Sequence, residues 1–264
     1  MKSYQDLLLK EGYPSASKLC DERAAALFVT FKAPPDWYGF PPALLPIMSD
    51  GTWPVYIGLW KHWFVPRAPT FVELNIGDDY KLEEIARTDR QLALLMLLRL
   101  IVLKDDVDSD VRWLAEHLGL SHDDVSRIDA FSQEYGDDPE YIFELPEFSE
   151  MLPLSFADGK PYDGEFPPAV ATNIAGLEIP IGETMQQTPS QPWLDPLTDK
   201  VELFSRYLSD GDFGRAWLTL NSRGWSFAAA AKAINELSIK AGDAEFSVVA
   251  SRWAEHAATY DGAY

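Results

Sequence analysis

An apolar stretch in the first half of the chain restricts the possible folds more than any other feature. Residues Gln91–Leu103 contain a single charge, Arg99, and helical spacing extends over Thr88–Leu103. The stretch is shorter than the ~20 residues that a membrane-spanning helix needs. Because such a helix is apolar around most of its circumference, other elements have to cover it on most sides. The sequence therefore predicts a buried helix.

Aromatic and β-branched residues ahead of this helix indicate a sheet. Val55–Trp60 and Thr70–Asn75 are predicted strands, and Trp63–Val65 is a candidate third strand between them. A sheet with one face in the core and the other beneath helices explains the aromatic residues. Because Lys61 and Arg67 are interleaved with them, stacking of nucleic-acid bases on the sheet is the alternative.

Helical patterns precede and follow these strands. The helices predicted in this part of the chain are Tyr4–Lys10, Ala16–Phe28, Pro41–Met48, Lys81–Arg87, Thr88–Leu103, Asp108–Leu118 and Ser121–Tyr135. Short strand-like pieces, Tyr141–Leu145 and Ala175–Ile181, lie in a loop-rich region after them. We therefore predict an α+β fold, with a small, mainly antiparallel sheet flanked by helices, in a domain of residues 1–185.

The last part of the chain has a different pattern. Gln186–Pro196 contains three prolines and polar residues, which is typical of a linker. Beyond it, four helical segments are separated by turns that contain glycine, a residue common at helix ends. These segments are Asp199–Ser209, Phe213–Arg223, Ser226–Ala241 and Ala244–Tyr260. We predict an all-α C-terminal subdomain at 197–264, joined through a linker at 186–196.

The composition indicates a folded cytoplasmic protein. Of the 264 residues, 47% are apolar and 13% aromatic, which is enough for a substantial core. Cys20 is the sole cysteine, so an intramolecular disulfide is excluded and an oxidising compartment is not needed. The first residues lack the basic region and apolar core of a signal peptide.

Negative charge is concentrated in residues 105–165, which we call the acidic segment. It holds 18 Asp or Glu residues against Arg112, Arg127 and Lys160, a balance of −15 out of −20 for the chain. Such a field repels nucleic acid and anionic membranes and attracts basic protein surfaces. We therefore expect a basic protein as the partner, with neither nucleic acid nor membrane bound.

Carboxylates and nearby aromatic residues of the acidic segment are the candidate partner-binding residues, with the aromatic ones as anchors. They are Asp105, Asp106, Asp108, Asp110, Asp123, Asp124, Glu134, Tyr135, Asp137, Asp138, Glu140, Tyr141, Phe143, Glu144, Glu147, Glu150 and Tyr162.

Residues 111–128 have the pattern of a helix-turn-helix, with Gly119 at the turn and Ser121 capping the second helix. A recognition helix meets phosphates with cations, whereas this second helix opens with Asp123 and Asp124. A plain helical hairpin is the favoured interpretation. A DNA-associated transcriptional regulator remains the alternative function.

Other motifs do not amount to a reaction centre. The run Asp106–Asp110 begins like a calcium loop, but Val111 stands where the loop needs glycine and His117 where it needs glutamate. The four histidines have no zinc-site spacing, and neither a phosphate loop nor a nucleophile elbow is found. We expect no catalytic residues, metal or cofactor. A hydrolase using carboxylates of the acidic segment is the remaining enzymatic alternative.

The order of motifs in the first part of the chain resembles the SUKH superfamily. The residues that carry this resemblance are the run Pro41–Gly51, then Pro54–Gly58 and Phe71–Glu73, within roughly residues 15–105. In that family a leucine-proline motif, an apolar helix and a Ser/Asp-Gly turn lead into a sheet. Many members are immunity proteins, antitoxins that neutralise toxins deployed between competing bacteria. The resemblance implies an α+β fold and binding of a cognate toxin.

Charge and resemblance together predict a non-enzymatic, intracellular immunity-type protein. Toxins that act on nucleic acid tend to present basic grooves, and an inhibitor rich in carboxylates can dock there with fast, salt-sensitive association. The sequence gives neither the identity of the toxin nor the oligomeric state.

Overall fold

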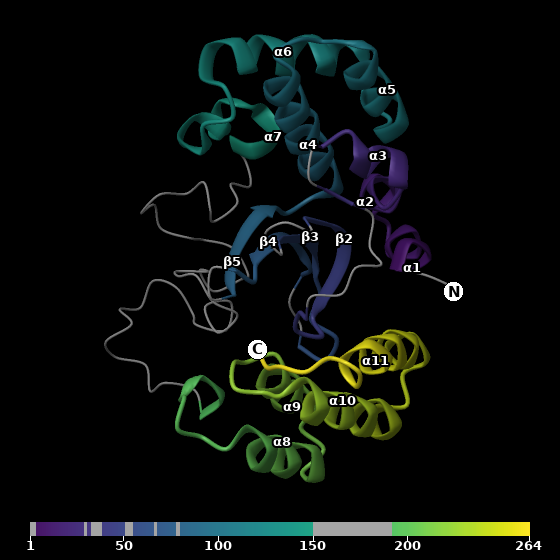
Figure 1. The fold of residues 1–264 in the computed structure, drawn as a ribbon, viewed down its shortest axis with the longest axis vertical. Helices are drawn as coiled ribbons and strands as arrows, with labels where there is room; N and C mark the ends of the chain where they lie inside the picture. The colour runs from purple at the N-terminus through teal and green to yellow at the C-terminus, as the bar shows by residue number, and fades with distance from the viewer. Residues whose placement is uncertain are drawn as a thin grey trace.

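A five-stranded antiparallel sheet lies at the centre of the computed structural model (Figure 1). The structure describes residues 4–28, 31–32, 39–50, 55–65, 68–77, 80–149 and 192–264. The strands are β1 (Phe31–Lys32), β2 (Leu44–Asp50), β3 (Val55–Trp60), β4 (Thr70–Asn75) and β5 (Lys81–Ala86). Each strand pairs with its neighbours in the sequence, so the sheet is a simple meander.

Both faces of the sheet are buried, as the alternation of side chains along β3 shows. Tyr56 and Trp60 belong to one hydrophobic cluster and Ile57 and Leu59 to the other, and all four are 0% exposed. Between them, Gly58 allows a close approach to β2, because a Cβ there would lie 2.6 Å from the carbonyl oxygen of Leu45. The strand needs apolar residues on both faces because helices cover both.

Helices from the first part of the chain lie on one side of the sheet. They are α1 (Tyr4–Lys10), α2 (Pro14–Leu19), α3 (Glu22–Ala26), α4 (Asp89–Lys104), α5 (Ser109–Leu118), α6 (His122–Tyr135), the 3-10 helix η1 (Pro139–Glu144) and α7 (Pro146–Ser149). Figure 1 shows α5 and α6 beyond α4, at the end of the molecule away from the C-terminal helices. We call α5, α6, η1 and α7 the outer layer.

The predicted apolar helix is α4, and it is buried as expected. A capping box between Thr88 and Gln91 starts it, and Asp105 in a left-handed conformation ends it. Arg99, the one charge in the apolar stretch, donates from Nη1 to Oε2 of Glu73 on β4 at 2.8 Å. The charge is thus paired where the helix passes the sheet.

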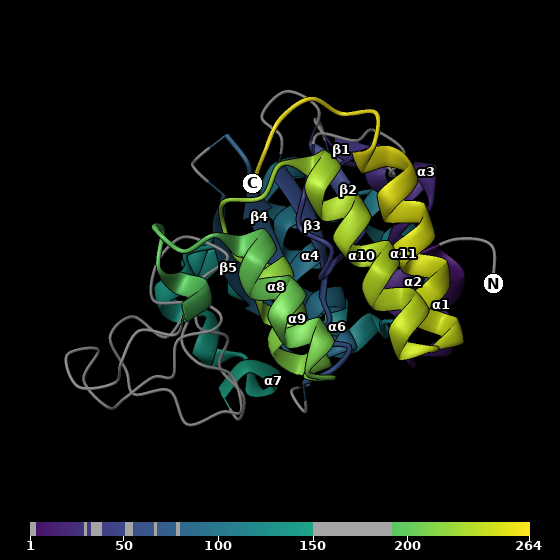
Figure 2. The same cartoon turned by 90° about the horizontal axis from the view of Figure 1, so that it is seen from below.

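The C-terminal helices cover the other face of the sheet (Figure 2). They are η4 (Pro192–Leu194), α8 (Lys200–Ser209), α9 (Phe213–Leu220), α10 (Phe227–Ala241) and α11 (Ala244–Ala257). Trp217, Trp225 and Trp253 are at most 1% exposed and lie in the same cluster as Tyr56 and Trp60 of β3. The helical C-terminal part therefore shares its core with the sheet.

The α+β fold class predicted from the sequence is confirmed, and several element boundaries are not. The sequence predicts helices at Pro41–Met48 and Lys81–Arg87, but the first overlaps strand β2 from Leu44 onward and the second contains strand β5. The residues of Lys81–Arg87 favour a helix by composition, but pairing with β4 makes the segment a strand. Glu84 in this strand is buried and accepts hydrogen bonds from Thr70 and Arg87. In short apolar runs such as Pro41–Met48, the periodicity of the sequence does not distinguish a strand from a helix.

Three smaller expectations are also corrected. Trp63–Val65 forms a bend, because the chain there leaves the sheet towards α9 and α11. The predicted helix Ala16–Phe28 is broken at Cys20–Asp21, where Asp21 caps a new helix. Tyr141–Leu145 lies mainly in the 3-10 helix η1.

Two predicted features fall largely outside the described residues. The strand-like piece Ala175–Ile181 lies wholly outside them, and of the linker at 186–196 only the part from Pro192 onward is described. The boundary between residues 1–185 and 197–264 stays a prediction. Within the described residues, no helix has the length and apolar character needed to cross a membrane.

Candidate functional site

The outer layer contains the described part of the acidic segment, and local capping signals shape it. Asp108 begins α5 by accepting hydrogen bonds from the backbone of Asp110 and Val111 at 2.8 and 2.9 Å. Gly119, at φ 81°, ends α5. Ser121 and Asp124 then form the capping box that begins α6. The sequence thus specifies a helical hairpin over residues 109–135.

An internal ion-pair network fastens this hairpin to α4 and α7. The guanidinium of Arg127 donates to both carboxylate oxygens of Glu147 at 2.6 Å and to Asp124 at 3.2 Å. Arg90 on α4 also pairs with Asp124. Because bidentate guanidinium–carboxylate pairs combine charge with fixed geometry, the Arg127–Glu147 pair fixes α7 against α6, and Arg90 connects both helices to α4.

The same contacts lower the pKa values of both carboxyl groups. Partial burial raises the pKa of Asp124, but hydrogen bonds from Ser121 and Arg90 outweigh it and hold the pKa far below the ordinary value. The hydrogen bond from Arg127 likewise lowers the pKa of Glu147. Both predicted partner-binding residues belong to the internal framework of the layer, and Asp124 is only 8% exposed.

Two other predicted carboxylates also have local structural roles. Asp108 is the cap of α5, and the backbone N–H of Val111 is the main cause of its lowered pKa. Asp110 pairs with Lys104 at 3.0 Å. By contrast, Asp105, Asp106 and Asp123 are exposed on the surface of the layer.

A compact patch at the end of α6 brings several predicted residues together. The rings of Tyr135 and Tyr141 stack with centroids 4.7 Å apart and an interplanar angle of 18°. Gly136 ends α6 with positive φ, and backbone hydrogen bonds from Asp138 to Tyr135 and from Tyr141 to Asp138 fold the chain back. The turn between the two tyrosines therefore creates the stack.

Carboxylates surround this stack. A hydrogen bond with Glu134 is the main cause of the raised pKa of Tyr135, and the charge of Glu144 raises it further. Asp137 and Asp138 lie exposed in the turn itself. The sequence has no Lys or Arg between residues 128 and 149. We call Glu134, Tyr135, Asp137, Asp138, Tyr141 and Glu144 the acidic aromatic patch.

The remaining predicted residues are not part of this patch as described. Phe143 is half-buried. Glu140 lies in η1, but its side chain is outside the described part of the structure. Glu150 and Tyr162 lie outside the described residues altogether.

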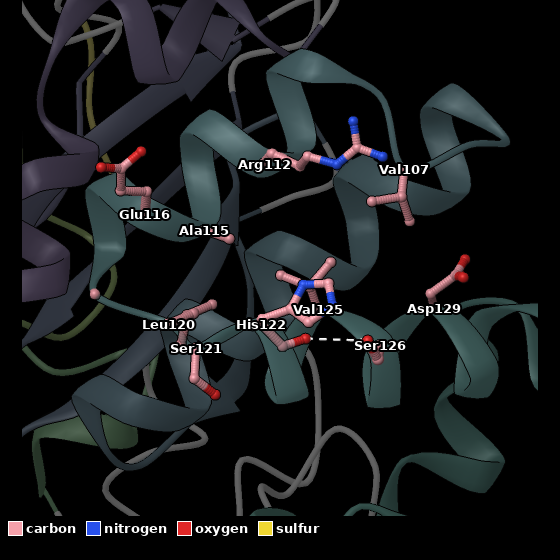
Figure 3. A pocket seen from close by; sticks show the side chains of 11 residues that line it. Val107, Arg112, Ala115, Glu116, Leu120, Ser121, His122, Val125, Ser126 and Asp129 are labelled. Atoms are coloured by element: carbon pink, nitrogen blue, oxygen red, sulfur yellow. Dashed lines mark hydrogen bonds between the residues drawn. The ribbon is translucent and has the colours of Figure 1, made fainter.

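A groove between α5 and α6 was not predicted from the sequence (Figure 3). Its volume is about 610 Å³. Its apolar lining residues are Val107, Ala115, Leu120 and Val125. Polar and charged side chains around it are Arg112, Glu116, Ser121, His122, Ser126 and Asp129. The pattern of the hairpin was visible in the sequence, but the packing that leaves this groove open depends on side-chain shape.

A second unpredicted feature lies where α3 meets α5. The guanidinium of Arg23 lies 3.9 Å from the ring centroid of Trp113, and the ring of His117 stacks on Trp113 at 4.7 Å. Nε2 of His117 is 3.2 Å from the carbonyl oxygen of Lys18. These contacts join α5 to the N-terminal helices and explain the half-burial of Trp113.

The side-chain contacts of the outer layer also test the calcium-like run and the helix-turn-helix segment. In the calcium-like run, the carboxylates of Asp108 and Asp110 are turned to a helix cap and to Lys104. No group of His, Cys, Asp or Glu side chains suited to a metal ion occurs among residues 4–149 and 192–264 as far as they are described. In the helix-turn-helix segment, the start of α6 carries exposed Asp123 next to buried Asp124.

No family model matches this chain, and neither a curated protein nor a solved structure matches it.

Proposed function

We propose that this protein is an immunity-type inhibitor that binds and neutralises a basic protein toxin through its acidic aromatic patch. The observation that carries the proposal is the stacked, partly exposed pair Tyr135 and Tyr141 among carboxylates. Large residues in cores are explained by packing, whereas Tyr141 is 41% exposed and stacks on another tyrosine at the surface. Exposed aromatic residues of this kind are common anchors in protein interfaces.

The chemistry of the patch fits lysine and arginine side chains. Aromatic rings attract cations positioned over their faces, by about 0.5–1 kcal/mol at exposed sites. The carboxylates of Glu134 and Glu144 act on Tyr135, and a cation approaching the ring would also meet these charges. Because screening at physiological salt leaves a range of about 8 Å, the attraction acts on a partner that docks closely.

Two further observations support an inhibitory role. The α+β fold class agrees with the one that the SUKH resemblance implies, and many SUKH proteins are immunity proteins, although the run that the family motif makes an apolar helix is strand β2 here. The charge of −20 over 264 residues also favours rapid capture of a basic protein, since complementary charge raises association rates. In this proposal the protein makes and breaks no bonds, and it acts by occupying the surface that the toxin uses.

Growth rescue tests the proposal directly. A panel of basic bacterial toxin domains is produced in cells with or without this chain, and we expect rescue from one cognate toxin. A variant with Glu134→Gln, Asp137→Asn, Asp138→Asn and Glu144→Gln removes the patch charge and keeps side-chain size. With the rescued toxin, this variant should associate at least about tenfold more slowly at low salt.

The salt dependence of the association rate can contradict the proposal that the patch is the docking surface. For the unsubstituted chain, the association rate should fall by about 10- to 100-fold between 25 and 400 mM NaCl. A rate that does not change with salt, together with full rescue by the neutralised variant, would rule out the patch as the docking surface.

The alternative, a DNA-associated regulator that uses residues 111–128, makes a separate prediction. In a gel-shift assay at low salt, a DNA-binding regulator should slow the migration of duplex DNA. An acidic inhibitor should leave the mobility of the DNA unchanged. The exposed Asp123 at the start of α6 opposes phosphate contact and favours the inhibitor.

A further inference from the structure

The groove between α5 and α6 has the properties of a pocket for an apolar side chain. Its apolar lining residues are Val107, Ala115, Leu120 and Val125, and its volume of about 610 Å³ lies within the range of small-molecule pockets, roughly 300–1,000 Å³. In Figure 3, Ala115, Leu120 and Val125 lie between Glu116 on one side and Asp129 on the other. Transfer of an apolar side chain from water into this groove would be favourable, because the side chain would contact apolar residues and few polar groups would be desolvated.

The charges at the groove indicate what flanks that apolar group. Glu116 projects from α5 and Asp129 from α6, on opposite sides of the groove in Figure 3. Arg112 is the cation among the lining residues, and its charge contributes to lowering the pKa of Asp108 beside it. The two carboxylates are thus placed to meet cations on either side of an inserted apolar residue.

The groove and the acidic aromatic patch lie along the same helix. Ser126 lines the groove and Tyr135 belongs to the patch, and both are in α6. Nine residues of helix at 1.5 Å each separate them by about 13 Å. Nine residues are also two and a half turns of helix, so Ser126 and Tyr135 face opposite sides of α6. The groove and the patch would therefore contact different parts of a partner.

From these observations we infer that the α5–α6 groove receives an aliphatic or aromatic side chain from a basic segment of the partner, with lysine or arginine on both sides of it. The inference rests on the proposed function and adds to it the recognition of one apolar residue. The patch supplies charge attraction, and the groove supplies the selection of a segment by its apolar residue.

Peptide binding to the full chain tests the inference. The probe is a fluorescein-labelled ten-residue peptide with Leu-Phe at its centre, two lysines on each side and neutral ends. A matched peptide has Ser-Ser in place of Leu-Phe. In fluorescence anisotropy at 100 mM NaCl, the Leu-Phe peptide should bind at least tenfold more tightly. Equal affinity for the two peptides would overturn the inference.

A substitution that fills the groove provides the matched comparison. Ser126 is exposed in α6 and its hydroxyl bonds to the carbonyl of His122 at 3.1 Å, and Ser205 in α8 has the same contact with Val201 at 2.8 Å. Ser126→Phe should reduce binding of the Leu-Phe peptide about tenfold, to the level of the Ser-Ser peptide, whereas Ser205→Phe should leave it unchanged. Equal binding by the two variants would contradict the inference.

Methyl NMR on the unsubstituted chain gives a readout that does not depend on the folding of a variant. The methyl signals of Leu120 and Val125 should shift during titration with the Leu-Phe peptide and stay in place with the Ser-Ser peptide. Unshifted signals at saturation would show that the peptide binds elsewhere.

The results separate this inference from the proposed function. If both peptides bind equally and the neutralised patch variant loses both, the groove inference fails and the charge-based proposal stands. If the Leu-Phe peptide binds independently of salt and of the patch charges but is lost in Ser126→Phe, the groove inference stands and the electrostatic proposal fails.

Discussion

The outer layer and the C-terminal helices use aromatic residues and charges in opposite ways. In the C-terminal helices, Trp217, Trp225 and Trp253 are almost fully buried against the sheet. In the outer layer, Tyr135 and Tyr141 stack near the surface, and ion pairs of Arg90 and Arg127 hold the helices in place. The comparison distinguishes aromatic residues that build the core from those that stack near the surface.

The largest effect should come from the core side of this comparison. Trp253 is 1% exposed, packs against Phe227 and Tyr264, and donates from Nε1 to the carbonyl of Phe40 at 2.8 Å. Trp253→Ala should lower the free energy of unfolding by about 3–5 kcal/mol, through lost burial and a cavity. Urea denaturation measures this value. A loss below about 1 kcal/mol would mean that the C-terminal helices contribute little to the shared core.

An intermediate effect is expected at the ion-pair network. Asp124→Asn keeps the shape of the side chain and removes its charge pairs with Arg90 and Arg127. Loss of charged hydrogen bonds at this nearly buried site should cost about 2 kcal/mol in urea denaturation. Asp123→Asn, one residue earlier and exposed, is the matched control and should change stability by less than about 0.5 kcal/mol. Equal losses would show that position 124 has no special role.

The same network predicts an acid-dependent loss of stability. The pKa values of Asp124 and Glu147 are lowered in the folded state from ordinary values of 3.8 and 4.5. Their stabilising contribution is therefore complete above the ordinary values and declines as pH falls through and below them. Thermal unfolding midpoints should decline as the pH is lowered from about 5 to about 2, and less steeply in Asp124→Asn than in Asp123→Asn. Parallel pH profiles for these two variants would contradict the assignment.

The smallest effect on stability is expected at the patch. Tyr141→Ala removes an exposed ring that stacks on Tyr135, and it should cost about 1 kcal/mol or less. Association with a basic partner should nevertheless weaken, because an anchor residue is lost. The free energy of unfolding and the affinity for the basic partner should both be measured on the same preparation of Tyr141→Ala. A stability loss as large as that of Trp253→Ala would place Tyr141 with the core residues.

Much of the fold was predictable where a pattern was long or its end signals were specific. The helix Asp89–Lys104 followed from its apolar length, and α6 followed from the cap at Ser121. The segments that became β2 and β5 were misassigned because their length and composition suit either structure. Pairing with β3 and β4 decides between the two, and those contacts are not local in the sequence.

The candidate site was predictable only in part, for a similar reason. The charge balance of the acidic segment located Glu134, Tyr135, Tyr141 and Glu144, but it did not separate them from Asp124. Asp124 has the same residue type and a more prominent position at a helix start, yet it points into contacts with Arg90 and Ser121. Whether a carboxylate faces a partner or an internal arginine depends on packing between α4, α6 and α7.

The sequential order of the sheet and its two helical coverings has a consequence for synthesis on the ribosome. Strands β2 to β5 and α4 are complete by residue 104, whereas α8 to α11 begin at residue 200. At 5–20 residues per second, the interval before the last helix emerges is on the order of 10 s. A sheet that forms in this interval leaves Tyr56, Trp60 and Leu74 without their C-terminal covering, and chaperones can bind such an exposed apolar face.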